Sequence, residues 1–335
     1  MSTDAVVVHV EYVVPESGRS LDPIEFLIGV LSDPMNTGLL TVGGAMTVGT
    51  LVGYLYVYET APLEVAMLRE SLTEDADFLP WLLRLSVGLP LVGAGFTGYF
   101  ISPAVTVPSD PAVAVPTRLF LVGIGFLLLF GIATRAAATV GLLACVSVTL
   151  LVAPQLLMAS EYLGGFLAIV LLGPSQPSVD RLLARLVETE GTRYTRLPPM
   201  RTLRAWTDRH LDPLAVYTPT VIRLGLGLNF VYTGLFDKLA QPAQALAVVE
   251  RYQLTHVVPV DPGLWVVGAG TTELALGIAL IVGLFTRGVA AIAFGMFTLT
   301  LFALPGDPVL AHVSLFGLAT ALLITGSGRI ALDKL

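Results

Sequence analysis

Charged side chains are scarce in this chain. They account for 13% of its 335 residues, whereas soluble domains carry roughly 25%. Hydrophobic residues account for 55%, and the mean hydropathy is +0.81. The charged residues are concentrated in a few segments, which leaves long uncharged stretches between them. This balance argues against a soluble globular protein and indicates an integral membrane protein.

Cysteine is nearly absent, because Cys145 is the only one. One cysteine excludes a disulfide within the chain and argues against thiolate metal ligation. Without a CxxCH motif, c-type haem is excluded. Haem b held between helices needs two facing histidines, yet His312 is the only one of the four in an apolar run. Neither haem nor a metal is expected, since no cluster has zinc-ligand spacing.

Lysine is rare, because the chain has only 2 Lys but 16 Arg. The net charge is −7 and the pI is about 5.1, a usage that resembles proteins of halophilic archaea. Nucleic acids attract basic surfaces. We therefore expect an acidic, membrane-held chain to have no nucleic-acid partner.

Nine runs of the chain are long and largely uncharged, as expected of transmembrane helices. They are 38–58, 80–102, 114–133, 136–153, 157–173, 218–239, 262–285, 288–304 and 309–326. The first run is not a cleavable signal, because 37 residues precede it without a basic n-region. The sequence thus predicts an all-α membrane protein with nine spans, beginning with an anchor helix at 38–58.

Arginine marks the cytoplasmic side, where loops of membrane proteins collect Lys and Arg. Segment 174–215 holds seven: Arg181, Arg185, Arg193, Arg196, Arg201, Arg204 and Arg209. The tail 1–37 holds one, and the connections 154–156 and 305–308 hold none. We expect a multi-pass protein of the cell membrane with its N-terminus outside and its C-terminus in the cytoplasm.

Two parts of the chain repeat each other. "RLSVGLPLVGAGFTGYF", which starts at Arg84, aligns without a gap on "RLGLGLNFVYTGLFDKL", which starts at Arg223. "GIATRAAA" at 131 aligns on "GLFTRGVA" at 283, and Asp180 stands opposite Asp333.

The repeat predicts two four-helix units, 80–182 and 218–335, joined by an Arg-rich cytoplasmic linker at 183–217. An even number of spans per unit places both the same way up, as a parallel repeat about an axis along the membrane normal. An extracytoplasmic tail, 1–37, and the anchor helix precede them.

The second unit resembles the DoxX family. The features are Arg223, the sequence "YTGLFDKL" that follows it, Glu273 in "GTTELALGIALIVGLFTR", and the ending "GSGRIALD". The first unit is similar to a degenerate copy of the same module. The resemblance, which extends to DoxD relatives, implies an integral membrane protein. Some members are associated with quinone-linked sulfur oxidation or terminal oxidase complexes, which implies quinone as a cofactor and redox subunits as partners.

A polar cluster is expected in the second unit. Glu273 lies 14 residues from Arg287, Lys238 lies 15 from Arg223, and His312 lies 17 from Arg329. At 1.5 Å per residue these separations are roughly 21–25 Å, so three helices carry the groups at similar depth. Asp237 and Tyr232 flank them, and Asn229 lies deeper. An ionised group at such depth is costly, so we expect Glu273 to face inward and pair with Lys238.

Two interpretations of this cluster stay open. It can be a ligand or proton-handling site that holds a quinone head-group or a small anion. It can equally be a buried ion pair that fixes the register of the helices. A Lys238 side chain that extends to the surface would weaken both.

The first unit departs from the pattern. Leu121 stands where Glu273 would be, and Tyr99 and Pro90 replace Lys238 and Asn229. Arg118 and Glu161, each near the outer end of its helix, are expected to form a structural ion pair. The hypothesis is that the second unit keeps a site and the first supports it.

Three classes of function follow. The resemblance favours a membrane subunit or accessory of a quinone-linked redox or respiratory system. Without a catalytic motif or redox centre of its own, the chain is an enzyme only as an oxidoreductase subunit. The alternatives are a non-enzymatic membrane scaffold or assembly factor, and a small-molecule transporter suggested by the repeat. Against transport, no pair of broken helices occurs at matching positions.

Overall fold

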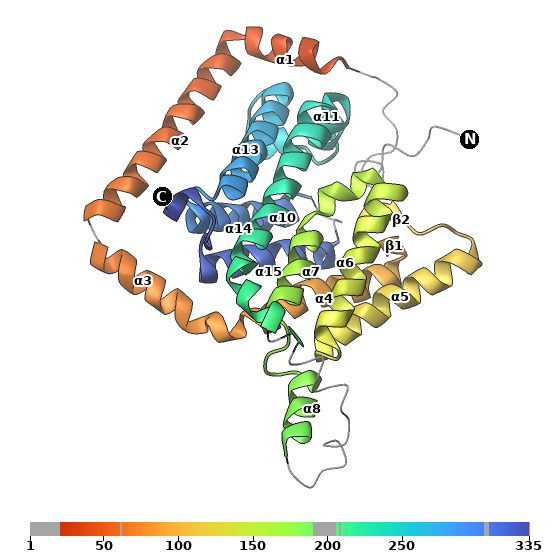
Figure 1. Ribbon diagram of the computed structural model, residues 1–335. Helices are drawn as coiled ribbons and strands as arrows, with labels where there is room; N and C mark the ends of the chain where they lie inside the picture. Colours follow the sequence, from red (N-terminus) through yellow and green to blue (C-terminus); the bar gives the residue numbers. More distant parts are fainter. Residues whose placement is uncertain (1–20, 61, 190–205, 208, 305–307, 335) are drawn as a thin grey trace.

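The computed structural model describes residues 21–60, 62–189, 206–207, 209–304 and 308–334. The start of the predicted N-terminal tail and most of the Arg-rich linker, including Arg193, Arg196, Arg201 and Arg204, lie outside these ranges. The described residues are almost entirely helical (Figure 1).

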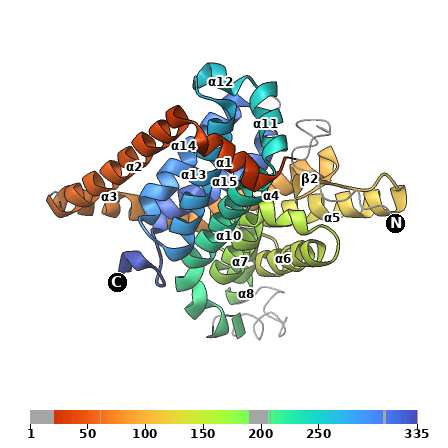
Figure 2. The ribbon, with the colours of Figure 1, turned by 90° about the horizontal axis from the view of Figure 1, so that it is seen from above.

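An arm of three helices opens the described chain: α1 (Pro23–Ser32), α2 (Pro34–Thr60) and α3 (Pro62–Glu74). Figures 1 and 2 show the arm along one side of the main bundle. Val30 of α1 is buried with Leu264. Near the other end of α2, Tyr54 packs edge-on against Phe285, with ring centroids 5.1 Å apart. Most of α2 is otherwise exposed, as expected of an anchor helix surrounded by lipid.

The main bundle follows the arm. Its first half comprises η1 (Asp75–Phe78), α4 (Leu79–Thr97), β1 (Tyr99–Phe100), β2 (Ser102–Thr106), α5 (Pro111–Phe130), α6 (Thr134–Leu151), η2 (Pro154–Ala159), α7 (Glu161–Leu172) and α8 (Val179–Glu188). Its second half comprises η4 (Asp212–Tyr217), α10 (Thr218–Tyr232), η5 (Thr233–Leu239), α11 (Pro242–Arg251), α12 (Leu254–Val257), α13 (Pro262–Val282), α14 (Thr286–Ala303), α15 (Val309–Thr325) and η6 (Leu332–Lys334). The strands form one small antiparallel hairpin.

Short sequence signals set the helix ends. Asp110 and Asp261 each precede a proline and accept hydrogen bonds from backbone amides of the first turn, as N-cap residues do. Gly131 and Gly283 end α5 and α13 with φ of 64° and 74°. This left-handed conformation favours glycine and stops a helix.

The two halves share a single hydrophobic core, whose centre is formed by α4, α7, α10 and α15. The helices α5 and α6 flank this centre on one side, and α13 and α14 on the other (Figure 2). Glycine permits a close crossing of α7 and α10: a Cβ on Gly164 would lie 2.7 Å from the Val221 carbonyl oxygen. On the opposite pair of helices, Gly317 of α15 packs directly against Ser86 of α4. The expected four-helix units are therefore packed into one bundle.

Matched contacts recur at the end of the bundle that holds two buried arginines. Arg84 and Arg223 are each 1% exposed. Arg84 donates to the Pro177 carbonyl oxygen, and Arg223 donates to that of Ile330. In each half, the first helix is thus tied to the segment that follows the fourth.

Two further pairs of residues repeat the pattern. Asp180 accepts hydrogen bonds from the backbone amides of Ala133 and Thr134, and Asp333 from those of Phe285 and Thr286. Likewise, Arg135 Nε donates to the carbonyl of Val170, and Arg287 Nε to that of Leu323. Each contact in the first half therefore has a counterpart in the second half, between the residues that the internal alignment predicts to be equivalent.

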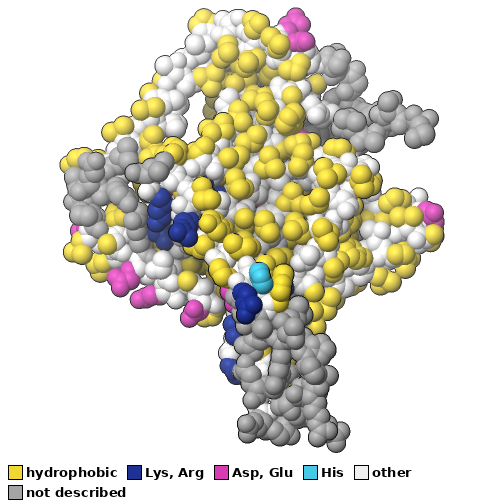
Figure 3. Space-filling model, viewed as in Figure 1, with side chains coloured by type: hydrophobic (Ala, Val, Ile, Leu, Met, Phe, Trp, Pro, Cys, Tyr) yellow, Lys and Arg dark blue, Asp and Glu magenta, His cyan; other side chains and the backbone are white. Residues whose placement is uncertain are grey.

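Seven helical segments of the described residues are long and apolar enough to cross a membrane. They are Pro34–Tyr54, Leu63–Thr97, Pro111–Phe130, Thr134–Leu151, Asp212–Leu239, Pro262–Val282 and Thr286–Ala303. The other two predicted spans correspond to the shorter apolar helices α7 and α15. Figure 3 shows hydrophobic side chains over much of one face. The all-α membrane fold is confirmed, while the count of nine spans stays a prediction.

Candidate functional site

A partly open cavity of about 190 Å³ lies where α7, α10, α13, α14 and α15 approach the β hairpin. Both halves of the chain line it. The first half contributes Ile101, Ser102, Pro103, Met158, Ala159, Glu161 and Tyr162, and the second contributes Asn229, Phe230, Thr233, Lys238, Glu273, Phe297, Thr300, Leu304, Ala311, His312 and Leu315. Nine of these eighteen lining residues are apolar, and the other nine carry ionisable or hydrogen-bonding groups, so the cavity combines the apolar walls and the polar groups with which ligand pockets orient their ligands.

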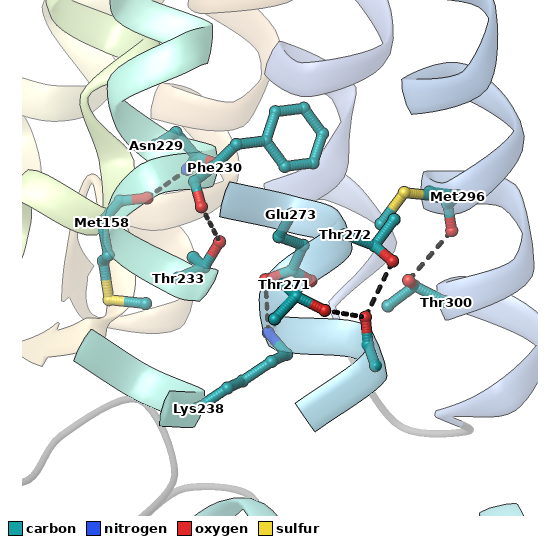
Figure 4. Close-up of polar contacts among 11 residues, drawn as sticks. Met158, Asn229, Phe230, Thr233, Lys238, Thr271, Thr272, Glu273, Met296 and Thr300 are labelled. Carbon is teal, nitrogen blue, oxygen red and sulfur yellow. Dashed lines mark hydrogen bonds and ion pairs between the residues drawn. The ribbon is translucent and has the colours of Figure 1, made fainter. Parts of the chain in front are cut away.

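An ion pair forms one wall of the cavity. Lys238 Nζ lies 2.7 Å from Glu273 Oε2, as the sequence led us to expect. The side chains are 28% and 15% exposed. Figure 4 shows Lys238 reaching from η5 to Glu273 on α13. Lys238 is therefore turned toward the acid on the neighbouring helix.

Local backbone geometry produces this pairing. The chain continues from α10 into a π-helical segment, η5, which carries Lys238. Gly234 in that segment lies against α13, because a Cβ there would be 2.6 Å from the Gly270 carbonyl oxygen. π-Helical turns are rare in proteins, but those that occur are often found at functional sites. The close approach of η5 to α13 brings Lys238 within reach of Glu273.

Two more of the predicted residues reach the cavity. His312 on α15 lines it, and its Nδ1 lies 3.3 Å from the Pro308 carbonyl oxygen. Asn229 on α10 uses its Nδ2 twice, donating to the Met158 carbonyl and, at 3.0 Å, to Glu161 Oε2. Glu273, Lys238, His312 and Asn229 are thus brought to one cavity from three long helices.

Asp237 and Tyr232 are not among the residues that line the cavity. Asp237 is half-buried, and its Oδ2 has no hydrogen-bond partner among the described residues. The Tyr232 ring packs at a tilt on Phe236, with centroids 5.1 Å apart. Both residues flank the ion pair along the chain, but a direct role in the cavity stays a prediction.

The expected pairing of Arg118 with Glu161 is wrong. Arg118 is exposed on α5, where its Nε donates to the Gly95 carbonyl at 2.7 Å. Glu161 is 3% exposed and accepts from Asn229 and from Ser314 Oγ, at 3.3 Å. The reason is that the chain forms η2 before α7 begins at Glu161. The start of α7 is therefore enclosed by α10 and α15.

Two residues of the cavity region escaped the sequence reasoning. Ser314 is fully buried on α15 beside Glu161. Tyr162 is 1% exposed, lines the cavity, and its hydroxyl has no partner in good hydrogen-bond geometry among the described residues. The alignment of the two halves held a signal for Ser314, because it stands twelve residues before Gly326 as Glu161 stands twelve before Gly173.

The corresponding region of the first half is apolar and filled. Leu121, the counterpart of Glu273, is 1% exposed and lies with Leu91, Phe120 and Phe166 around a gap too small for water. Around Leu121, the first half thus has a small apolar gap where the second half has its polar cavity. The first half instead contributes residues to the lining of the cavity in the second half. Its part in the site is thus larger than the supporting role expected from the sequence.

The comparisons with known proteins identify one family. The family model described as DoxX matches residues 218–306, which include α10, the Lys238–Glu273 pair and α14. No curated protein and no solved structure matches the chain significantly. This C-terminal part of the chain is therefore similar to the DoxX family, and the described helices have the length and composition of those of an integral membrane protein.

Proposed function

We propose that this protein is a membrane subunit of a quinone-linked redox system and that its cavity receives the quinone head-group. The observation that carries the proposal is the arrangement of Lys238, Glu273 and His312 around one partly open cavity, half of whose lining residues are apolar. A quinone head-group is a flat apolar ring with two oxygens. It matches a pocket that has apolar side chains to pack against the ring and polar groups that can donate to those oxygens.

The size of the cavity limits what can enter. Its volume of about 190 Å³ is room for roughly six waters at about 30 Å³ each. Pockets for drug-sized ligands occupy about 300–1,000 Å³. A head-group fits this space better than a whole prenylated quinone, so an isoprenoid tail would lie outside the cavity, among lipid chains.

The chain supplies binding and proton chemistry in this proposal. The Lys238 ammonium has three N–H donors, of which Glu273 occupies one, so it can also donate to a quinone oxygen. The His312 imidazole can donate or accept at a second oxygen. Electrons would come from, or go to, a partner redox subunit, because no redox centre is encoded in the sequence.

Binding of menadione, a quinone without a tail, tests the proposal. Protein in lipid nanodiscs is compared with empty nanodiscs of the same lipid, and bound quinone is measured by absorbance after separation. We expect saturable binding that Lys238→Met weakens by about tenfold or more, since loss of a hydrogen bond to a charged group costs about 1.5–3 kcal/mol. Lys334→Met, which removes the other lysine, serves as control. Equal uptake by protein and empty discs would refute the proposal.

The structural alternative has its own support. The Lys238–Glu273 contact is complete at 2.7 Å without any ligand, and such a pair alone can fix helix register. A scaffold or assembly factor needs nothing more. If menadione does not bind while removal of either partner destabilises the bundle, this alternative is the better description. Transport is less well supported, because α4 runs through Pro90 without a break.

We also propose that the two halves are a tandem repeat about an axis along the membrane normal, with the buried arginines at the cytoplasmic end. Two matches between the halves support the repeat. Arg84 and Arg223 make equivalent contacts, each in its own half, and so do Asp180 and Asp333. In this orientation α1 and the cavity lie at the outer end, and the C-terminus lies inside.

A further inference from the structure

We propose that Glu161, which comes from the N-terminal half, is the group that exchanges protons with the ligand of this cavity. The identity of the ligand rests on the proposed function, but the protonation of Glu161 does not. The proposal makes the cavity a composite site: the DoxX domain supplies the ion pair, and the divergent half supplies the proton carrier.

The two carboxylates of the cavity have different surroundings. Glu273 lies 2.7 Å from an ammonium, and a nearby opposite charge favours the charged form of a carboxyl group. Glu161 is more deeply buried and has no ion-pair partner among the described residues. Its two oxygens contact an amide and a hydroxyl instead. Two acids in contrasting surroundings are the usual basis for a division between a fixed charge and a proton carrier.

The hydrogen bonds of Glu161 accommodate both of its protonation states. Ser314 Oγ has one proton but two acceptors within 3.3 Å, Glu161 Oε1 and the Ala311 carbonyl oxygen. When Glu161 is ionised, Ser314 donates to it. When Glu161 carries a proton, Ser314 can turn to Ala311 and accept from the Glu161 hydroxyl. Asn229 donates to the other oxygen in both states, so no buried group loses its partner.

The Tyr162 hydroxyl points to a ligand at the same place. It is buried, belongs to the cavity lining, and has no partner in good hydrogen-bond geometry among the described residues, although Ser314 lies near enough to interact with it. Buried polar groups are rarely left without a partner in native structures. A ligand oxygen beside Glu161 would satisfy this hydroxyl, so a ligand in the cavity could contact Glu161 and Tyr162 as well as Lys238.

Other titratable groups surround Glu161. Cys145 of α6 interacts electrostatically with Glu161, and Tyr99 of β1 interacts in the same way with Tyr162. His312 of α15 and the Lys238–Glu273 pair line the same cavity. The pair is held together at 2.7 Å, so a change of charge on Lys238 or Glu273 would break an ion pair, whereas Glu161 has none among the described residues.

The proton transfer balances as follows. An O–H bond of a quinol breaks, an O–H bond to a Glu161 oxygen forms, and the electron pair of the broken bond stays on the quinol oxygen. No electron leaves the ligand in this step. The proton then moves from Glu161 to water at the open side of the cavity, which restores the carboxylate.

Infrared difference spectroscopy of the full-length protein in nanodiscs tests the proposal without a ligand. A pH step should produce a protonated-carboxyl C=O band that Glu161→Gln removes. Asp237→Asn and the exposed-residue control Glu70→Gln should keep the band. If Glu161→Gln does not fold, Ser314→Ala replaces it and should shift the same band to higher frequency, because one hydrogen bond is lost. A band that survives Glu161→Gln, or that only Asp237→Asn removes, would overturn the proposal.

Adding menadiol separates this proposal from the proposed function. With both correct, menadiol binding changes the Glu161 band in the wild type, and Glu161→Gln still binds but loses the pH dependence of binding. If the band belongs to Glu161 but neither quinone form binds, the proposed function fails and the proton carrier stands. If menadione and menadiol bind and no Glu161 band appears, the proton carrier fails and the proposed function stands.

Discussion

Glu161 and Ser314 occupy the same place in their respective halves, and they meet: Ser314 Oγ lies 3.3 Å from Glu161 Oε1. Each residue stands twelve positions before the glycine that ends its helix, Gly173 or Gly326. The two halves thus bring equivalent positions together at the centre of the bundle. One position carries a carboxyl group and the other a hydroxyl group, so the two side chains form a hydrogen bond. Two ionised carboxylates at these positions would repel each other.

Asn229 should stabilise this contact measurably. Its amide donates to both Glu161 and the Met158 carbonyl, and Asn229→Leu leaves both buried acceptors short of a donor. We expect a loss of about 1–3 kcal/mol in the free energy of unfolding, measured by unfolding in SDS mixed micelles. Thr320→Val is the control, because the Thr320 hydroxyl bonds only within its own helix. Equal losses for the two variants would contradict the prediction.

The Lys238–Glu273 pair should be energetically coupled. Single variants Lys238→Met and Glu273→Leu each leave a half-buried charge unpaired, whereas the double variant leaves none. The double variant should therefore be more stable than the sum of the single losses implies, by about 0.5–3 kcal/mol. A double-mutant cycle in the same micelles measures this. Exact additivity would mean that the pair contributes nothing to the fold, as holds for many exposed pairs.

Gly131 and Gly283 should not tolerate alanine. Both have positive φ, which costs other residues about 1–2 kcal/mol. An added Cβ would also overlap the guanidinium of Arg84 or Arg223. We expect Gly131→Ala and Gly283→Ala each to lower the thermal unfolding midpoint clearly.

The matched controls are Gly123→Ala and Gly295→Ala, where an added Cβ has nothing within 4 Å. These should be neutral or slightly stabilising, because alanine favours helix over glycine by about 1 kcal/mol. A control as destabilised as the two variants would show that the arginine contacts are not the cause.

Labelling of single cysteines tests the orientation. In a Cys145→Ser background, Glu250→Cys on α11 should react with a membrane-impermeant thiol reagent in intact cells. Asp77→Cys in η1 should react only after permeabilisation, because η1 lies at the other end of α4 from the hairpin. Both residues are exposed. The reverse pattern would invert the proposed topology.

Much of the fold could be predicted because helix signals are local. Uncharged runs, Asp–Pro starts and glycine stops are all properties of short segments, and the pairing of Glu273 with Lys238 followed from helical rise alone. The errors in the predicted fold also concern short segments. The predicted span 80–102 runs past Gly98, where φ of 94° ends α4, and the sequence did not reveal that β1 and β2 pair beyond it.

The site was harder to predict because it depends on contacts between the halves. Reading each half as a separate bundle placed Glu161 at a helix end beside Arg118. The close crossing of α7 and α10 at Gly164 and Gly225 encloses it instead. Glycine frequency indicated close packing, but a single sequence does not state which helices are neighbours. The position of the cavity, and the roles of Ser314 and Tyr162 in it, depend on which helices are neighbours.

In the proposed orientation, the shortness of α7 would make the site sensitive to membrane voltage. Its 12 residues span roughly 18 Å of a hydrocarbon core about 30 Å thick, and Arg135 holds its far end at the Val170 carbonyl. A proton that reaches Glu161 from outside would cross roughly two fifths of the core. At about 2.3 kcal/mol per charge per 100 mV for a full crossing, an inside-negative potential would favour occupancy by roughly 1 kcal/mol per 100 mV. The intensity of the Glu161 infrared band in energised proteoliposomes would report this coupling.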